Sequence, residues 1–276
     1  MGEKFGYIGM DLCLNQKAPM SSSQEALDPR DWIAGLEKGL HIIEAFDAAH
    51  PRLTATEMGE RCGMTRTAAR RYLKTLLHLG YVGSDGKLYW LMPRILRLGH
   101  AYLESARLPR LVQPFLQRIT AGTEEIAYLG VLDGGDTIFI ARSGLQRQMA
   151  SGYMTGTRVP TQVTAAGMIM LAYSDEAFID EWMKTYDLRA FTSFTLSSKT
   201  ELKETLVGFK RQGWSVSEQQ LELNFRGIAV PLLDRQNHVL GAISITMPIN
   251  REETDHALNR VLPVLQEAAY SLRPLL

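Results

Sequence analysis

The sequence predicts an α+β protein of two domains, in which a small N-terminal winged helix-turn-helix is joined by a helix to a larger domain of mixed helices and strands. The 276-residue chain exceeds the usual size of one domain, and its 45% apolar content is enough for ordinary packed cores. Helical spacing, a glycine turn and a hairpin signal come first, and helices alternating with short strands follow. We therefore expect a flexible tail at 1–29, the winged helix-turn-helix at 30–91, a linker helix at 92–107 and the second domain at 108–276.

Composition narrows the class of protein further. The 30 basic and 30 acidic side chains cancel, so whole-chain charge gives no sign of attraction to nucleic acid or to a membrane. Two distant cysteines, Cys13 and Cys62, argue against a disulfide framework, and the six histidines show no metal-ligand spacing. The chain shows no membrane-spanning run and no signal-peptide pattern. We expect a cytoplasmic protein with no cofactor, no metal and no membrane partner.

The first predicted element is a helix in which apolar residues recur on one face from Ile33 to Phe46. A short helix at 54–62, a turn at Gly63 and a longer helix at 66–79 follow in that order. This order of helix, tight turn and helix is typical of a helix-turn-helix.

Cap and turn residues predict where the next elements begin and end. Thr65 is suited to cap the longer helix, and Gly80 is suited to end it. The Asp85-Gly86 turn lies within the stretch 81–91, which has good strand propensity, so a hairpin is expected as the wing. Pro93 suits the first turn of the linker helix.

The helix at 66–79 carries four cations and no acid in a chain whose net charge is zero. Guanidinium groups on its exposed face suit guanine edges and phosphates, and a lysine at the wing tip suits a phosphate. A solvated charged face is the alternative for a basic helix taken alone, but the neighbouring turn, cap and wing favour DNA binding. The candidate DNA-binding residues are Thr65, Arg66, Thr67, Arg70, Arg71, Lys74 and Lys87.

Beyond residue 108 the pattern alternates between helices and strands. We expect helices at 111–121, 164–173, 176–186, 200–212 and 253–272, and strands at 126–132, 137–141, 228–232 and 239–246. A turn is expected at 133–136, where two glycines lie between two aspartates.

Four stretches of the chain resemble the IclR family of bacterial regulators, and the resemblance extends over nearly everything from Trp32 onward. They are Ile33 to Leu40, Thr65 to Val82, Gly156 to Pro160 and Arg226 to Pro231. The first two stretches look most like the branch of the family that controls protocatechuate and p-hydroxybenzoate catabolism. The resemblance implies a C-terminal α/β effector-binding domain with a curved antiparallel sheet.

The resemblance also implies where the effector lies, between a glycine loop and residues of the sheet. The carried-over positions are Thr155, Gly156 and Thr157 on the loop, and Ser217, Gly227, Ser244 and Thr246 on the opposite wall. Glycine lets backbone donors approach an anion, and hydroxyls both donate and accept hydrogen bonds. For each hydroxyl the alternative is a structural role, in which it faces solvent on a strand or caps a loop.

Two arginines, Arg142 and Arg158, are the candidate partners of a ligand carboxylate, and a salt bridge within the protein is the alternative for each. Ser217 stands where the family usually has an acid, and Gly227 where it has a larger residue. Both departures favour an aromatic acid over a very small oxoacid. The candidates to line an aromatic site, although such residues more often belong to a core, are Met149, Met154, Phe139 and Met247.

The predicted function is sequence-specific regulation of transcription, with genes of aromatic-compound catabolism as the expected targets. The expected partners are a double-stranded DNA operator, an aromatic acid as effector, and further copies of the chain in a homodimer or homotetramer, because one recognition helix reads few bases. An enzyme acting on a small organic acid is the alternative, but no nucleophile elbow, zinc-protease or nucleotide-binding motif occurs in the chain. A non-specific architectural DNA protein is disfavoured by the large second domain.

Overall fold

The computed structural model describes residue 28, residues 30–145 and residues 152–276. The tail expected at 1–29 lies outside the described residues, apart from Asp28. The chain forms two compact units, one ending at Tyr102 and the other beginning at Leu103, so the division falls inside the stretch expected as a linker. Each unit is described by itself.

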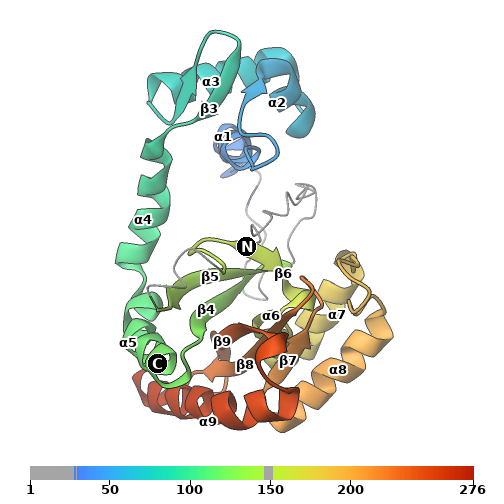
Figure 1. The fold of residues 1–276 in the computed structure, drawn as a ribbon. Helices are drawn as coiled ribbons and strands as arrows, with labels where there is room; N and C mark the ends of the chain where they lie inside the picture. Colours follow the sequence, from blue (N-terminus) through green and yellow to red (C-terminus); the bar gives the residue numbers. More distant parts are fainter. Residues whose placement is uncertain (1–27, 29, 146–151) are drawn as a thin grey trace. The chain divides into compact units, whose positions relative to one another are not determined.

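The N-terminal unit is a winged helix-turn-helix, as expected. Its helices are α1 (Ala34–Glu44), α2 (Ala55–Arg61) and α3 (Arg66–His78). Its strands β1 (Leu53–Thr54), β2 (Val82–Ser84) and β3 (Leu88–Leu91) form an antiparallel sheet in the order β1-β3-β2 (Figure 1). Ile42, Met58, Leu73 and Tyr89 join all three helices and the wing in one core.

A 3-10 turn at Pro93–Ile95 leads into α4 (Leu96–Ser105), the expected linker helix. None of the residues of α4 is buried within the chain. Leu96, Leu98 and Tyr102 expose 71%, 47% and 47% of their surface, so the apolar side chains of this helix are left largely uncovered.

The C-terminal unit is built on a curved six-stranded sheet in the order β6-β5-β4-β9-β8-β7, with every neighbouring pair antiparallel (Figure 1). Its strands are β4 (Ile126–Asp133), β5 (Asp136–Ser143), β6 (Arg158–Pro160), β7 (Ser215–Glu218), β8 (Phe225–Leu233) and β9 (Val239–Pro248). Strand β9 lies beside β4, although about a hundred residues separate the two in sequence, and β8 follows on the other side of β9.

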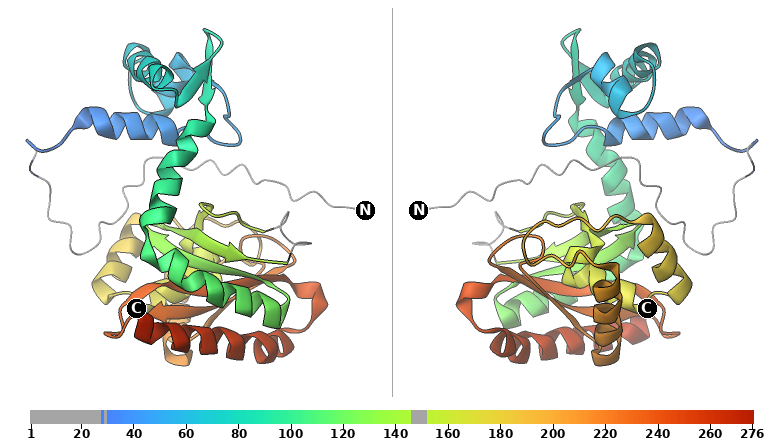
Figure 2. Two further views of the ribbon diagram at one scale, coloured as in Figure 1. Left: turned by 90° about the vertical axis from the view of Figure 1, so that its left-hand side faces the viewer. Right: turned by 90° about the vertical axis from the view of Figure 1, so that its right-hand side faces the viewer.

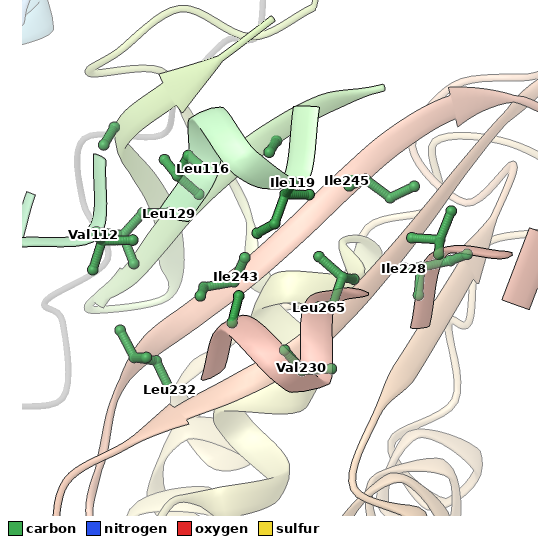
Figure 3. Close-up of a cluster of buried hydrophobic side chains, with 14 of the residues drawn as sticks. Val112, Leu116, Ile119, Leu129, Ile228, Val230, Leu232, Ile243, Ile245 and Leu265 are labelled. Atoms are coloured by element: carbon green, nitrogen blue, oxygen red, sulfur yellow. The ribbon is translucent and has the colours of Figure 1, made fainter. Parts of the chain in front are cut away.

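Helices cover both faces of this sheet (Figure 2). One face carries α5 (Arg107–Thr123) and α9 (Thr254–Leu272), and the other carries α6 (Ala165–Tyr173), α7 (Glu176–Thr185) and α8 (Lys199–Gln212). Side chains alternate along β9, so Ile243 and Ile245 pack toward α5 and α9 (Figure 3), whereas Ala242 and Ser244 face the other layer.

The sequence-based elements differ from the structure in two respects. Helix α5 begins at Arg107, four residues before the predicted start at residue 111, because Pro109 lies in the first turn, where a missing N–H leaves no helical bond unmade. The strands β1, β6 and β7 were not predicted at all. They contain two to four residues, too few for alternation to be visible in the sequence.

Candidate DNA-binding face and effector cavity

A capping box fixes the start of α2, and a close backbone contact and a left-handed glycine shape the turn between α2 and α3. The Thr54 hydroxyl accepts a hydrogen bond from the Glu57 N–H, and the Glu57 carboxylate accepts one from the Thr54 N–H, which forms a capping box. A Cβ on Gly59 would lie 2.7 Å from the carbonyl oxygen of Met64, so glycine is required for this approach. Gly63 has a φ of 62°, in the left-handed region that suits the tight turn.

Helix α3 begins where the sequence predicts it, because the Thr65 hydroxyl accepts a hydrogen bond from the Ala68 N–H at 3.2 Å. Ala69, Leu73 and Leu76 form its buried side. The predicted DNA-binding residues Thr65, Arg66, Thr67, Arg70, Arg71 and Lys74 are all exposed. Within the described chain, none of its four cations has a carboxylate partner, so all remain available to DNA.

The wing adds one more cation. Asp85 accepts hydrogen bonds from the N–H groups of Lys87 and Leu88 at 2.9 and 2.8 Å, and Gly86 has a φ of 98°. These bonds lower the pKa of the Asp85 carboxyl and fix the turn. Lys87 lies exposed at the tip. The structure therefore places every predicted DNA-binding residue on the exposed surface of α3 or the wing.

The C-terminal unit contains a cavity enclosing about 440 Å³ of empty space, part of which is open to solvent. Strands β5, β7, β8 and β9, the start of α6 and the loop between β7 and β8 surround it. Its lining consists of Phe139, Tyr153, Val163, Thr164, Ala165, Ala166, Ser217, Gln219, Gln220, Leu221, Glu222, Phe225, Arg226, Gly227, Ser244, Ile245 and Thr246. The four sheet positions predicted for the effector site, Ser217, Gly227, Ser244 and Thr246, are thus brought together here.

One wall of the cavity is the N-terminus of α6. The hydroxyls of Ser215 and Ser217 donate to the carbonyl oxygens of Ala165 and Val163, each at 2.7 Å, and attach this segment to β7. The Thr164 hydroxyl caps the helix by accepting from the Gly167 N–H at 3.0 Å. The N–H groups of Ala165 and the next residue remain without a partner in the described structure, as expected for a first helical turn.

The floor of the cavity is polar. Ser244 is only 4% exposed, and within the described residues its hydroxyl has no hydrogen-bond partner. Thr246 lies two residues further along β9 on the same face and pairs across the sheet with Gly227. The Ser244 hydroxyl is not among the fully buried polar atoms of the described chain, so it can be reached from the cavity and is suited to bind a ligand atom or a water.

Aromatic rings form another side of the cavity. Phe139 and Tyr153 are stacked, with ring centroids 5.1 Å apart and an interplanar angle of 16°. The Tyr128 ring lies 4.9 Å from that of Phe139, and its hydroxyl accepts a hydrogen bond from the Tyr153 N–H. Burial raises the pKa of both tyrosines, which keeps their hydroxyls neutral. Of the other candidates for an aromatic site, Met247 packs on the opposite face of the sheet, Met154 is exposed, and Met149 lies outside the described residues.

The cation that lines the cavity, Arg226, is already bound within the protein. Its guanidinium donates to the carboxylate of Glu218, to the Thr254 hydroxyl at 2.8 Å and to the carbonyl oxygen of Glu252 at 3.1 Å. Burial acts to raise the pKa of Glu218, but the hydrogen bonds from Thr254 and Arg226 outweigh it and lower that pKa. Arg226 therefore holds β7 and β8 to the start of α9.

The remaining predicted effector residues are not among the described lining of this cavity. Thr155 and Gly156 are exposed, and the loop of residues 155–157 pairs with β5 through the Gly156 N–H, which donates to the carbonyl oxygen of Phe139 at 2.7 Å. Residues 155–157 are thus not among the described lining, although Gly156 contacts Phe139, which is, and residues 163–166 form one wall of the cavity. Thr157 accepts a hydrogen bond from the Met154 N–H through its side chain.

The two arginines predicted to meet a carboxylate are also placed elsewhere. Arg158 forms salt bridges with Asp133 and Asp136, which is the alternative to a ligand contact that the sequence had left open for this residue. Arg142 donates to the carbonyl oxygen of Tyr153 at 3.1 Å and so supports the aromatic side from outside the lining. The start of α6 and the loop at 219–222 were not predicted as parts of the site, and no local motif marks them.

Two absences hold for the described part of the chain. Residues 28, 30–145 and 152–276 contain no group of three or more His, Cys, Asp or Glu side chains placed to bind a metal ion. Within the same residues, no helix has the length and apolar character that crossing a membrane requires.

Comparison with known proteins matches both units to one family. The family model of the IclR helix-turn-helix domain matches residues 35–86, and that of the bacterial transcriptional regulator IclR C-terminal domain matches residues 100–273. The Pca operon regulatory protein of Acinetobacter baylyi is 38% identical, over 93% of this chain and 94% of that protein. The p-hydroxybenzoate hydroxylase transcriptional activator of the same species is 37% identical, over 92% and 95%.

A solved structure resembles the C-terminal unit. It is a double mutant of the inducer binding domain of the PobR transcription factor from Acinetobacter, in complex with 3-hydroxybenzoic acid. It is 31% identical with a TM-score of 0.59, and the match covers 62% of this chain and all of that domain.

Proposed function

This chain belongs to the IclR family of bacterial transcriptional regulators, and from that membership we propose that it binds an operator through α3 and the wing while a small aromatic carboxylic acid in the C-terminal cavity modulates this binding or its activity. The observation that carries the proposal is the cavity itself, which combines an aromatic side, a hydroxyl without a partner in the described chain and the N-terminus of a helix. Genes of aromatic-compound catabolism are the proposed targets, since the relatives named above regulate such genes.

The ligand carboxylate binds at the N-terminus of α6 in this proposal. Ala165, Ala166 and Ser244 line the cavity, and neither the first two N–H groups nor the Ser244 hydroxyl has a partner within the described chain. A helix N-terminus carries about half a positive charge and donates its first N–H groups to anions. This arrangement supplies a carboxylate site even though Arg158 and Arg226 are occupied in ion pairs.

The ring of the ligand packs against Phe139 and Tyr153, whose stacked rings offer an apolar surface. The polar groups placed at one end and the aromatic surface at another suit an aromatic acid. The 3-hydroxybenzoic acid bound by the similar inducer binding domain supports this ligand class.

Thermal denaturation with a panel of aromatic acids tests the effector half of the proposal. A ligand that binds only the folded protein adds about 2.7 kcal/mol of stability at 100 times its Kd, so at least one acid is expected to raise Tm clearly. Ser244→Ala is expected to reduce that shift, whereas Ser197→Ala, at an exposed position, leaves it unchanged. A panel without any stabilising acid would remove the aromatic effector from the proposal.

Selection of bound duplexes from random DNA, followed by titration, tests the operator half. Arg70→Ala is expected to weaken binding to the selected site by about 1 to 3 kcal/mol and to relax the base preference, if the guanidinium reads a base edge. Lys74→Ala, which removes a phosphate contact, weakens binding to all sequences alike. Unchanged affinity in Arg66→Ala, Arg70→Ala and Arg71→Ala would remove α3 from the DNA interface.

A further inference from the structure

One acid lines the cavity without a partner in the described structure. Glu222 lies on the loop between β7 and β8, and its carboxylate forms no hydrogen bond or ion pair with any described residue. Glu218, four residues earlier, is bound to Arg226 and Thr254 instead. The fold therefore uses Glu218 and leaves Glu222 available to a ligand.

The loop that carries Glu222 is held firmly in place. Gln219 and Asn224 adopt positive φ angles of 54° and 67°, and the Gln219 side chain accepts a hydrogen bond from the Asn224 N–H at 3.0 Å. The hydroxyls of Thr192 and Thr195 donate to the carbonyl oxygens of the loop at 2.6 Å each. A carboxylate on a loop fixed at these points is preorganised, as a group that selects ligands must be.

Glu222 lies at a different depth from the proposed carboxylate site. Ser244 lies in the middle of the sheet, paired with Tyr128 on β4 and Ala229 on β8. The loop of Glu222 begins where the pairing of β7 with β8 ends, at Glu218 and Arg226. Ser244 is buried and Glu222 is partly exposed, so the first lies at the floor of the cavity and the second near its rim.

A carboxylate in this position has a chemical consequence for an anionic ligand. It repels a ligand that offers only a carboxylate, and within the described lining the guanidinium of Arg226 is too engaged to offset this repulsion. A ligand with a ring hydroxyl instead donates a charge-assisted hydrogen bond to the same carboxylate. Phe139 and Tyr153 line the same cavity and offer the ring of the ligand an apolar surface.

We propose that Glu222 accepts a hydrogen bond from a ring hydroxyl of the effector and thereby makes the cavity select hydroxylated aromatic acids over unsubstituted ones. This inference rests on the proposed function, because it requires that aromatic acids bind in the cavity. A hydrogen bond to a charged group corresponds to an affinity ratio of about 10 to 100 between ligands with and without the donor.

Titration calorimetry with benzoate, 3-hydroxybenzoate and 4-hydroxybenzoate tests the selection. The parent is expected to bind at least one hydroxybenzoate about 10 to 100 times more tightly than benzoate. In Glu222→Ala the two affinities converge, because hydroxybenzoate binds more weakly while benzoate binds as well as before or better. Glu204→Gln, an exposed acid on α8, serves as the control and keeps the preference of the parent.

The possible failures are distinguishable. If benzoate and the hydroxybenzoates bind the parent equally, or if Glu222→Ala keeps the preference, Glu222 does not select the ligand, although the cavity still binds aromatic acids. An equal loss for all ligands in Glu222→Ala overturns the inference too, because it shows a structural role for the side chain. If none of the three acids binds the parent, the proposed effector class fails together with this inference.

Discussion

Gly227 lies in the cavity wall, where β8 passes close to the start of α6. It lies between Ser217 on β7 and Thr246 on β9, and a Cβ built on it would meet the Cβ of Ala165 at 3.3 Å. Its φ lies outside the left-handed region, so the backbone does not require glycine here. The missing side chain at position 227 therefore leaves free the space between β8 and the start of α6.

We expect Gly227→Ala to fold and to bind effector slightly less well, and Gly227→Leu to lose about 5-fold to 150-fold in effector affinity. The larger side chain overfills a closely packed site, which typically costs about 1 to 3 kcal/mol. Titration calorimetry on both folded variants measures the graded loss, and operator binding without effector is the control. Equal effector affinity in the parent and in Gly227→Leu would remove position 227 from the binding site.

At the scale of elements, the contact between α2 and the turn before α3 depends on one glycine. A Cβ on Gly59 would lie 2.7 Å from the Met64 carbonyl oxygen, which belongs to the backbone and cannot swing away. Gly39 in α1 is the matched case, because a Cβ there would have no atom within 4 Å. The two glycines differ in their surroundings and not in their secondary structure.

Gly59→Ala is expected to destabilise the N-terminal unit by about 1 to 3 kcal/mol, because α3 must shift to relieve the overlap. Gly39→Ala is expected to leave stability unchanged or to raise it by up to about 1 kcal/mol, since alanine is the better helix former. Urea denaturation followed by far-UV circular dichroism compares them. If the two variants had the same free energy of unfolding, the close contact at Gly59 would not affect stability.

A second contact between elements is made by the charged side chain of Arg260, which connects α9 to the end of α5 and the start of β4. Arg260 on α9 donates to Glu125 at 3.2 Å, to Glu252 at 3.0 Å and to the carbonyl oxygen of Thr123 at 2.7 Å. The hydrogen bond from Arg260 lowers the pKa of Glu252, whereas burial raises that of Glu125 despite its two arginine partners. Arg260 therefore compensates two carboxylates at once.

Arg260→Met is expected to cost about 2 kcal/mol of stability at pH 7, less than the loss of a fully buried partner because Arg260 is partly exposed. A carboxylate whose pKa is lowered by folding stabilises the protein above its unfolded pKa and loses that effect as the pH falls. The difference in free energy of unfolding between parent and variant should therefore become smaller below pH 4.5, which is the ordinary pKa of Glu252. Denaturation at several pH values measures it, with Lys203→Met at an exposed pair as the control. If the stability difference did not change with pH, the lower stability of Arg260→Met would come from lost packing and not from lost charge.

For the whole molecule, the uncovered apolar side chains of α4 suggest that copies of the chain associate there. Leu98→Asp is expected to lower the association state, because it places a charge among Leu96 and Tyr102, which are also exposed within one chain. Sedimentation velocity measures the assembly, and operator titration with and without effector measures the response. A variant that assembles and responds like the parent would make α4 a spacer only.

The N-terminal unit could be predicted from sequence almost completely, whereas the C-terminal cavity could be predicted only in part. The side chains of Thr65 and Asp85 accept hydrogen bonds from residues two or three positions away, and the glycines Gly63 and Gly86 act through their own positive φ angles. Such signals are local. The cavity wall depends on the Ser217 hydroxyl reaching Val163 across 54 positions. No spacing in the sequence encodes that contact, so residues 163–166 were not expected as a wall of the cavity, whereas the loop at 155–157 stays a prediction.

The two outermost strands of the large sheet are its shortest, with three residues in β6 and four in β7. Pro160 in β6 has no N–H to offer a neighbouring chain, and the charged Arg158 and Glu218 flank these margins. Hydrogen-bonded addition of a foreign strand is therefore discouraged at both margins. Association of the C-terminal unit with another molecule must then proceed through side-chain surfaces, and the same feature protects the sheet against amyloid-like stacking at high protein concentration.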